Sequence, residues 1–579
     1  MAADGRMPST SSRPALRDSW FLAAIVLLSS SLYVARLGFY SDDWSSLDRM
    51  SRAGGGSIPD LFRSLHEPQH AMRPGQLLCI ATLYSFFGLQ PIGYHLANSL
   101  IFVVMAEFLY LALRRLNVSR LLAVSIALVF VLLPHYSANR FWFSTVAHTL
   151  SMALYFASLY ALLRALNARD GPPFWSWLGA SLGALVASGL CYEVPLPLFV
   201  VNAGLAWRLG PRLAEKAQAA VSTARARAII AGGLTIVSIV AIAAFKWQTT
   251  VRLGSDEYRS TLTILRKAWQ LNVPPENYGL NIEQALRTGF GDYGVGLPRL
   301  VLHVLRDGQP LSTLVLTLIA AVAIGWYLLA LARSSVEATA DRATALRRSA
   351  ALLAGGFGVF WLGYAIFLTN SNVQFTTTGI GNRANIGAAA GVALVLVGAV
   401  YGVSSLWSSP NSRSRAFGLM VAILCASSIL LNNDLALHWI RAFDLQRSIL
   451  ADIHRQLPSL PPRSTLILDG VCPYIGPAIV FESSWDLRGA LRVMYRDSTI
   501  EADIATTRMV VAPQELSTEI YSFVYHYPFR DGLQVYDHLR RRAYPLTDAE
   551  AARRYFAERP FSPSRDCPPG REGLGAPAW

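Results

Sequence analysis

Charged residues are scarce in this chain. Of its 579 residues only 15% are charged, against about 25% in soluble domains. Hydrophobic residues make up 53% of the chain, and the mean hydropathy is +0.35. A soluble protein of this length would divide into several domains with charged surfaces. The composition therefore excludes an ordinary soluble enzyme, a disordered chain and a collagen-like repeat.

Cysteine and the common short catalytic motifs are also rare or missing. Five cysteines in a chain of this length are too few for a disulfide-stapled secreted module. No CxxC or P-loop pattern occurs in the sequence. Chemistry that depends on those motifs is therefore not indicated.

What the chain does have is a series of long apolar runs. A helix that crosses about 30 Å of hydrocarbon needs roughly 20 mostly apolar residues. Such runs lie near residues 20–37, 91–113, 121–134, 141–163, 174–190, 194–207, 228–245, 311–331, 349–369, 384–406 and 416–431. We therefore predict a mainly α-helical, polytopic protein of the bilayer with about eleven transmembrane helices. The first run has no small-residue cleavage site after it and is predicted to be a retained anchor.

The basic residues predict the orientation of these helices. Arg and Lys concentrate in alternate short loops, such as 114–120, 208–227 and 342–348, and in the N-terminal segment. Loops of this kind face the cytoplasm, so the N-terminus is predicted inside and the C-terminus outside. The net charge of +14 then marks the cytoplasmic side, and a nucleic-acid partner is not expected.

The predicted topology divides the chain into three parts. Residues 1–19 form a disordered cytoplasmic segment, and residues 20–431 form the transmembrane domain with large outer loops at 38–90 and 246–310. Residues 432–579 form an extracytoplasmic mixed α/β domain, with strands expected near 464–469, 478–481, 509–512 and 532–536. Helices are expected at 487–495 and 548–558, the second with Thr547 and Glu550 as a capping box. Cys472 and Cys567 both lie in this domain, and we predict a disulfide between them in an oxidising compartment.

Two adjacent carboxylates, Asp42 and Asp43, lie just beyond the first apolar run in the sequence Gly-Phe-Tyr-Ser-Asp-Asp-Trp, residues 38–44. Neighbouring side chains point in different directions on a helix and on a strand. One carboxylate is therefore expected to face a site, while the other caps a helix or binds a basic partner. The alternative is an ordinary helix cap beside an interfacial belt of aromatic residues.

More polar side chains follow in the same outer loop, namely His66, Glu67, His70 and Arg73. The amphipathic run 77–87 is too short to span and is predicted to lie in the membrane interface. Groups able to act as base, donor and anion binder therefore gather at headgroup level. An arginine such as Arg73 can bind a phosphate through two parallel hydrogen bonds. The alternative is an arginine that snorkels, with its guanidinium reaching the polar edge of the membrane.

Four further residues are candidates for the same site. His135 and Arg140 lie in one short outer loop, and either line the cavity or form an ordinary interfacial loop. Glu193 is a carboxylate at membrane depth, which is either functional or a cap of the next half-helix. Arg383 ends the polar loop 369–383, and we expect it to be a second phosphate contact.

Several of these motifs resemble a known family. The sequence is similar to the C-type (GT-C) membrane glycosyltransferases, in the branch of protein O-mannosyltransferases and aminoarabinose transferases. The resemblance covers roughly residues 20–207 and is carried by the acidic motif at 41–44, Arg73-Pro74 before a short helix, Gly-Tyr-His-Leu-Ala-Asn at 93–98, Arg114-Arg115, Leu-Leu-Pro-His at 132–135, and Phe141-Trp142.

The resemblance implies a function for the first outer loop. A polyprenyl-phosphate-linked sugar would be the donor, and transfer would be inverting, on the outer face of a bacterial plasma membrane. Asp42 or Asp43 would be the base, and basic residues would hold the lipid phosphate. The family's second loop acid is matched only loosely, by Glu67, so a divalent metal stays an open possibility. The chemistry agrees, because inverting transfer needs a carboxylate for the acceptor proton and cations for the departing phosphate.

The sequence leaves three functions open. The first is a glycosyltransferase whose acceptor is an envelope glycan, a lipid or a protein hydroxyl. The second is a transporter or flippase of lipid-linked sugars, which needs similar phosphate-binding groups but no base, although no inverted repeat is visible. The third is a non-catalytic membrane protein of envelope assembly.

Overall fold

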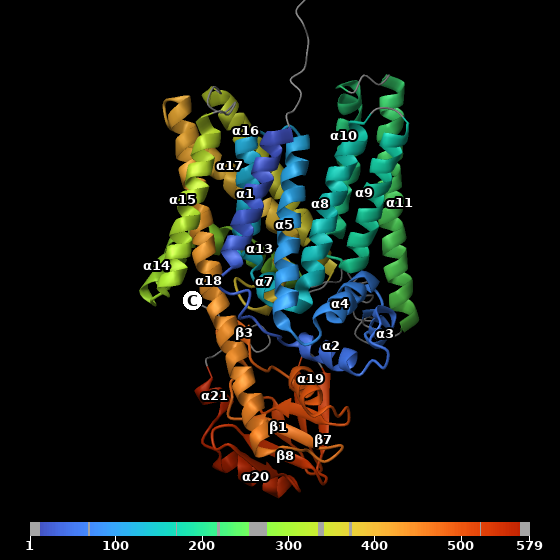
Figure 1. The fold of residues 1–579 in the computed structure, drawn as a ribbon, viewed down its shortest axis with the longest axis vertical. Coiled ribbons are helices and arrows are strands. Elements are labelled where there is room, and N and C mark those ends of the chain that lie inside the picture. The colour runs from blue at the N-terminus through green and yellow to red at the C-terminus, as the bar shows by residue number, and fades with distance from the viewer. Residues whose placement is uncertain are drawn as a thin grey trace, which may run out of the picture.

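A bundle of long helices makes up most of the computed structural model, which describes residues 12–67, 70–168, 171–216, 221–253, 275–333, 341–369, 373, 375–520 and 523–567. A smaller mixed domain lies at one end of the bundle, called here the domain end (Figure 1). The bundle helices are α1 (Ser12–Ser30), α5 (Pro91–Arg115), α6 (Arg120–Leu132), α8 (Val146–Leu166), α9 (Pro172–Cys191), α10 (Phe199–Lys216), α11 (Val221–Leu253), α15 (Leu311–Arg333), α16 (Arg342–Ala365), α17 (Ile386–Ser404) and α18 (Pro410–Gln456).

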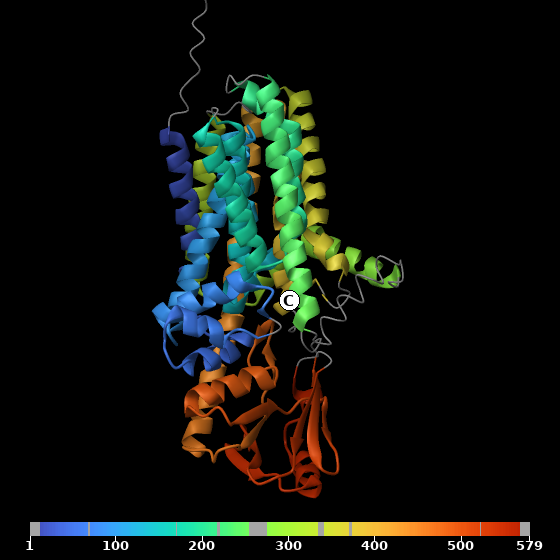
Figure 2. The same ribbon diagram turned by 90° about the vertical axis from the view of Figure 1, so that its right-hand side faces the viewer.

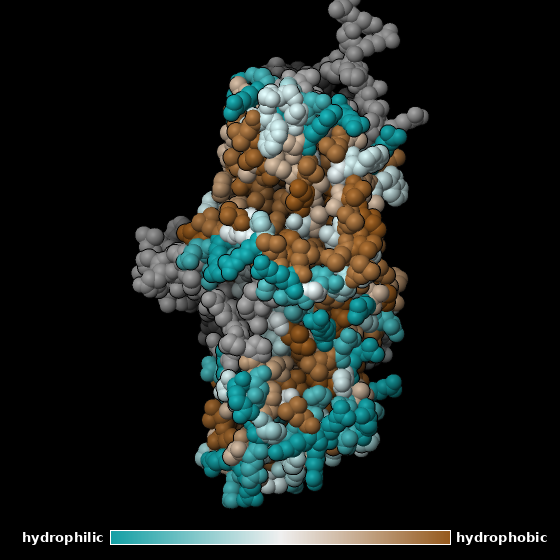
Figure 3. All heavy atoms as spheres, turned by 90° about the vertical axis from the view of Figure 1, so that its left-hand side faces the viewer, coloured by the Kyte–Doolittle hydropathy of each residue, from teal (hydrophilic) through white to brown (hydrophobic). Residues whose placement is uncertain are grey.

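Seven helices among the described residues are long and apolar enough to cross a membrane. They contain α5, α8, α9, α11, α15, α17 and α18. Apolar side chains cover the flank of the bundle, and hydrophilic ones cover its far end and the mixed domain (Figure 3). Large apolar side chains such as Leu318, Val322 and Trp326 are exposed on α15. A water-soluble protein rarely exposes apolar side chains in such numbers. The protein is therefore an integral, multi-pass membrane protein.

The other four predicted crossings are also helical, but they do not meet the same length and hydropathy limits. Helix α6 has 13 residues and α10 contains charged residues in its second half. Helix α16 begins with a basic turn, and α1 ends at Ser30, before the predicted end of the first run. The apolar runs thus identified helices correctly, whereas the count of eleven stays a prediction.

Short helices cover the domain end of the bundle. The first loop folds into α2 (Asp42–Ser51), α3 (Ile58–Ser64) and α4 (Pro74–Phe87), which lie between the bundle and the mixed domain (Figures 1 and 2). Helix α4 contains the amphipathic run predicted at 77–87 and exposes Leu78 and Phe86. The helices α13 (Pro275–Leu286) and α14 (Leu297–Arg306), joined by the π-helix η5 (Arg287–Val295), project from the side of the bundle (Figure 2).

Helix α18 joins the two parts of the molecule. Its 47 residues run from the bundle into the mixed domain (Figure 1). Its second half packs against that domain through Trp439, Ile440 and Ile449, which share one hydrophobic core with Tyr40 of the first loop and Phe481 of the mixed domain. A single core across the junction fixes the mixed domain against the turn that precedes α2.

The mixed domain is built on a four-stranded sheet in the order β4–β1–β8–β9. Strand β1 (Thr465–Asp469) is buried throughout and pairs in parallel with β4 (Glu501–Ile504) and β8 (Leu533–Asp537), while β9 (Arg542–Pro545) is antiparallel to β8. A second sheet contains β5 (Met509–Val511), β6 (Glu515–Ile520) and β7 (Phe523–Pro528), and β2 (Tyr474–Ile475) pairs with β3 (Ala478–Ile479). The helices are α19 (Ser484–Tyr495), α20 (Ala549–Glu558) and the short α21 (Pro563–Asp566).

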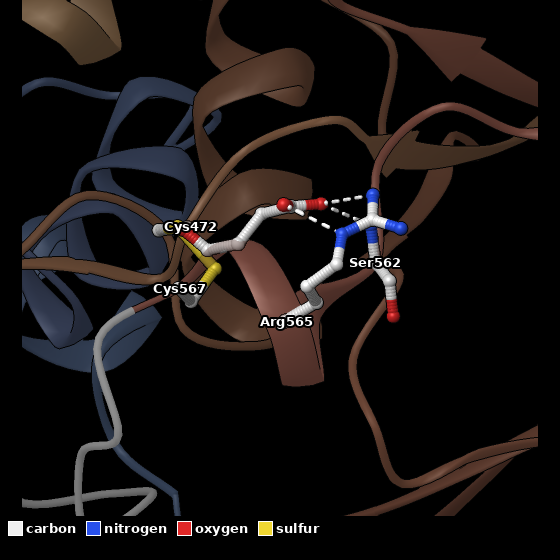
Figure 4. Close-up of a disulfide and its surroundings, with 5 residues drawn as sticks. Cys472, Ser562, Arg565 and Cys567 are labelled. Atoms are coloured by element: carbon white, nitrogen blue, oxygen red, sulfur yellow. Dashed lines mark hydrogen bonds and ion pairs between the residues drawn. A yellow bond between two sulfur atoms is a disulfide. The ribbon is translucent and has the colours of Figure 1, made fainter.

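The details of this domain correct one prediction. Asp548, and not Thr547, is the N-cap of α20, because the Asp548 carboxylate accepts a hydrogen bond from the backbone N–H of Ala551 at 2.8 Å. Cys472 and Cys567 form a disulfide with Cα atoms 5.5 Å apart, beside the Arg565 and Ser562 side chains (Figure 4). The disulfide ties the segment after α20 to the loop that follows β1.

Candidate active site

The turn before α2 separates the two adjacent carboxylates. The backbone N–H of Asp43 donates to the Tyr40 carbonyl at 3.0 Å, which closes a tight turn with Ser41 and Asp42 at its centre. Asp42 and Asp43 then form the first turn of α2. Successive helical side chains diverge by about 100°, so the two carboxylates enter different surroundings.

Asp43 points inward and supports the loop that opens α8. Its carboxylate accepts hydrogen bonds from the Ser144 backbone N–H at 2.8 Å, from the Ser144 hydroxyl, and from the Tyr40 N–H at 2.9 Å. Only 1% of the residue is exposed. Burial raises the pKa of Asp43 to about 7, although these hydrogen bonds oppose the shift. Asp43 therefore serves as an internal cap.

Asp42 points the other way, into a cavity of about 320 Å³ at the domain end. Asp42 is an exposed residue that lines this cavity. Desolvation by the surrounding protein raises the pKa of Asp42, and the nearby charges of Arg383 and Arg49 lower it only in part. A carboxylate with a raised pKa is a stronger base than an exposed one.

The cavity lining is mainly polar and contains three arginines, with a few apolar residues. Its lining includes Ser46, Arg49, Leu65, His70, Arg73, Gln76, Leu77, Ile80, Trp142, Ser144, Thr145, His148, Tyr192 and Arg383. Four residues predicted for the site, Asp42, His70, Arg73 and Arg383, thus lie around one cavity although they come from distant parts of the chain. Helix α4 contributes two of the apolar lining residues, Leu77 and Ile80.

Arg73 belongs to a partly buried ion triad. Its Nε lies 3.0 Å from Oε2 of Glu193, and the Lys246 Nζ lies 2.9 Å from Oε1 of the same carboxylate. Burial raises the pKa of Glu193, but Arg73 and Lys246 together outweigh it and hold the pKa at about 2. The Arg73 guanidinium also lies 4.1 Å from the centre of the Tyr192 ring. Glu193 is thus a permanent anion that fixes Arg73 in the wall and does not cap a half-helix.

Arg383 is held differently, by neutral partners. Its Nη1 donates to the Ile380 carbonyl at 2.6 Å, and its guanidinium lies 5.2 Å from the Trp142 ring centre. Within the described part of the chain no carboxylate lies within 4.0 Å of its nitrogens. Its charge is therefore less compensated than that of Arg73, and it remains able to bind an anion in the cavity.

The remaining residues of the first loop occupy the rim. Glu67 forms an ion pair with Arg49 at 2.7 Å and lies 3.8 Å from His70. Burial, with Arg49 and Arg73 nearby, lowers the pKa of His70 to about 4, so its ring is neutral at pH 7. His66 is exposed and is not a lining residue. Glu67 thus contacts two lining residues, Arg49 and His70, without lining the cavity itself, and His66 lies outside the cavity lining.

His135 and Arg140 do not line the cavity, contrary to the prediction. His135 is fully buried, with its Nε2 3.2 Å from the Tyr364 hydroxyl. The Arg140 guanidinium lies 4.5 Å from the Phe102 ring centre and is 6% exposed as a residue. The loop that carries them folds inward, because Asn382 and Asn385 donate to the His135 carbonyl at 2.9 Å.

The structure adds residues that the sequence did not single out, chiefly Arg49, His148, Lys246 and Glu482. Arg49 follows Asp42 by seven residues, which places both on one face of α2. Lys246 follows directly after a predicted span, and a lone cation at that depth is a signal of function. His148 and Glu482 carried no comparable signal, because their neighbours are distant in sequence.

No group of three or more His, Cys, Asp or Glu side chains that could hold a metal ion occurs in the described ranges. The Glu67 carboxylate, the loosely matched second acid, pairs with Arg49. The acidic residues that face the cavity therefore do not form an evident metal-ligand set among these residues.

A second, larger cavity of about 720 Å³ lies beside α14. Arg287, Arg299, His303 and Arg306 line it, together with Asp292 and two threonines of the 373–385 loop. The Thr377 hydroxyl donates to the Asp292 carboxylate, and Arg287 lies 3.9 Å from the same group.

No protein-family model matches the chain, and no curated protein matches it in sequence. Among solved structures, the chain is similar to the crystal structure of ArnT from Cupriavidus metallidurans bound to undecaprenyl phosphate. The two share 15% sequence identity and a TM-score of 0.36, over 85% of this chain and 90% of that chain. A likeness of this degree carries no argument about chemistry, which depends on the residues of the site.

Proposed function

We propose that the protein is a membrane glycosyltransferase of GT-C type that takes a sugar from a polyprenyl-phosphate donor. The observation that carries the proposal is the Asp42 carboxylate, which lines one cavity together with Arg383, Arg49 and Arg73. A base of raised pKa next to anion-binding cations is the pair of functions that inverting transfer requires.

The proposed reaction assigns one role to each side of the cavity. Asp42 accepts the proton of an acceptor hydroxyl while that oxygen forms a bond to the anomeric carbon. The bond from the anomeric carbon to the phosphate oxygen breaks, and the electron pair leaves with polyprenyl phosphate. Arg383 stabilises the negative charge on that phosphate. Arg73, held by Glu193, fixes the wall against which the sugar lies.

The apolar residues of α4 support a lipid-linked donor. Helix α4 contributes Leu77 and Ile80 to the cavity and exposes Leu78 and Phe86 on its other side. A polyprenyl chain can lie along this helix while its phosphate reaches the arginines at headgroup depth. A soluble nucleotide-sugar donor would gain nothing from this surface.

The same proposal includes the topology. We infer eleven crossings of a bacterial plasma membrane, with the N-terminus in the cytoplasm and the cavity and mixed domain outside. In support, the first loop and the mixed domain lie at the same end of the bundle (Figure 1), as that orientation requires. The acceptor is then an envelope glycan, lipid or protein that carries a free hydroxyl.

Transfer is tested by turnover with a panel of polyprenyl-phosphate sugars and the purified protein in detergent. We expect release of polyprenyl phosphate, with inversion at the anomeric carbon of the product. A transporter of lipid-linked sugars would instead move the intact donor across vesicle membranes without release. Donor movement without polyprenyl phosphate release would overturn the proposal in favour of transport, and neither activity would favour an assembly role.

A further inference from the structure

Ser41 adopts a backbone conformation that normally belongs to glycine. Its φ of 46° and ψ of −119° match the second residue of a type II′ turn, a position dominated by Gly. The turn is closed by the hydrogen bond from Asp43 N–H to the Tyr40 carbonyl. A side chain at such a position costs about 1–3 kcal/mol and persists only where surrounding contacts enforce it.

The contacts that enforce it come from the mixed domain. The Ser41 hydroxyl donates to Oε1 of Glu482, and the Trp485 indole N–H donates to the Ser41 hydroxyl at 3.2 Å. Ser41 is 1% exposed and Glu482 is 4% exposed. These bonds link the turn before α2 to the segment before α19, which lies more than 400 residues later in the chain.

Glu482 is itself held on both sides. Its Oε2 accepts a hydrogen bond from the Tyr474 hydroxyl at 2.6 Å. Its backbone N–H donates to the buried Asp486 carboxylate at 2.7 Å, as part of the cap of α19. The carboxylate of Glu482 is therefore held in one position, and it restrains Ser41 through the hydrogen bond from the Ser41 hydroxyl.

Helix α19 is packed so closely on α2 that the contact depends on a glycine. A Cβ atom on Gly489 would lie 2.6 Å from the carbonyl carbon of Trp44. Arg492 of α19 also lies 3.8 Å from the Asp48 carboxylate of α2. These contacts dock the mixed domain on α2 without involving Ser41, so docking alone does not explain a serine at a glycine position.

We propose that Glu482 is a positioning residue that acts through Ser41 to hold Asp42 in its productive direction, so that the mixed domain is part of the catalytic machinery. The inference rests on the proposed function, in which Asp42 is the base. Ser41 directly precedes Asp42, so any rotation of the turn re-aims the carboxylate. The carboxylates of Asp42 and Glu482 also interact electrostatically. Burial raises the pKa of Glu482, the hydrogen bonds from Ser41 and Tyr474 oppose this shift, and the charge of Asp42 adds to it.

Ser41→Gly is the sharpest test, because glycine fits the turn and the variant is expected to fold. It removes the hydroxyl and the strain but leaves the α2–α19 contact intact. We expect kcat to fall about 10- to 100-fold, since a misplacement of the order of 1 Å costs that much, with little change in KM for the donor. Glu482→Gln should act in the same direction, and Trp485→Phe more weakly. Glu515→Gln is the matched control, because Glu515 lies on β6 and pairs with His526, away from α2.

A second measurement does not need turnover. Hydrogen exchange in residues 38–44 should be faster in Ser41→Gly and Glu482→Gln than in the wild type and in Glu515→Gln. Unchanged exchange and wild-type kcat in Ser41→Gly would overturn the positioning role. If Asp42→Asn retains full turnover the proposed function fails instead, and the exchange result still decides whether Glu482 restrains the turn.

Discussion

Two cavities lie near the domain end of the bundle, and they differ in what their charges can do. The cavity beside α14 is the larger, about 720 Å³ against about 320 Å³. Its arginines Arg287, Arg299 and Arg306 are exposed, and its carboxylate, Asp292, already accepts a hydrogen bond from Thr377. The smaller cavity instead combines the Asp42 carboxylate with cations that are held by a carboxylate or a carbonyl. Chemistry is thus better indicated by restrained charges than by volume.

Loss of Arg383 should produce the largest difference between the two cavities. Arg383→Gln removes the least compensated cation from the Asp42 cavity. We expect turnover to fall about 10²- to 10³-fold, as for the loss of one group that stabilises developing charge. Arg299→Gln, the matched change in the α14 cavity, should leave turnover unchanged. Steady-state kinetics of both variants tests this. Equal losses of turnover in Arg383→Gln and Arg299→Gln would show that the Asp42 cavity is no more important for turnover than the α14 cavity.

Loss of Glu193 should destabilise the protein more than loss of the carboxylate in the α14 cavity. Glu193→Gln leaves Arg73 and Lys246 without their shared, partly buried carboxylate, which costs about 1–3 kcal/mol. Asp292→Asn removes the charge that accepts from Thr377 and lies 3.9 Å from the exposed Arg287, and an exposed ion pair of this kind is worth about 0–1 kcal/mol. Thermal unfolding in detergent compares the two, and a larger loss in Asp292→Asn would contradict the account.

The sequence predicts those features of the structure that depend on neighbouring residues, and it misses those that depend on contacts between residues far apart in the chain. The apolar runs located the bundle helices, and the buried strands β1 and β8 were predicted because their residues are uniformly apolar or alternate. Strands β6 and β7 were missed, because both carry polar residues and lie largely exposed. Their pairing depends on each other and leaves no strong local pattern.

The site shows the same limit. The sequence placed Asp42, His70, Arg73 and Arg383 in one hypothesis, since each lies in a polar loop near an expected membrane boundary. It did not distinguish Asp42 from Asp43, because the partner that occupies Asp43 is Ser144, about a hundred residues later. It also misplaced His135 and Arg140, whose loop folds inward onto Asn382. Local pattern thus identifies candidate groups, whereas tertiary contacts decide which of them share a cavity.

The pH dependence of turnover should report the charges around Asp42. Asp42 must be ionised to accept a proton, and its pKa is raised by burial, so activity should rise with pH above the 3.8 of an ordinary aspartate. Arg49 partly lowers this pKa, so Arg49→Gln should move the acid limb to higher pH. Asp43 also titrates, with a pKa of about 7. Arg49 is not among the groups that shift the pKa of Asp43, so we expect this pKa to be the same in the variant. If the acid limb of the Arg49→Gln profile lies at the same pH as in the wild type, Arg49 does not influence the pKa of the base. The same change at Arg306 of the α14 cavity should have no effect.

The smallest effect on either cavity should follow loss of the disulfide. Cys472→Ser frees the segment after α20 and should destabilise the mixed domain by about 2–4 kcal/mol. Neither cavity includes these cysteines, so turnover should match the wild type at temperatures where the domain stays folded. Limited proteolysis and turnover, measured on the same sample, test both parts.

The central claim is that Asp42 is the catalytic base and that the smaller cavity is the active site. Its most direct test is release of polyprenyl phosphate by Asp42→Asn and Asp292→Asn, each compared with the wild type on one active donor. We predict a loss of about 10²- to 10⁴-fold in Asp42→Asn, as for removal of a general base, and wild-type release in Asp292→Asn. Full release by Asp42→Asn, or its loss in Asp292→Asn alone, would contradict the claim.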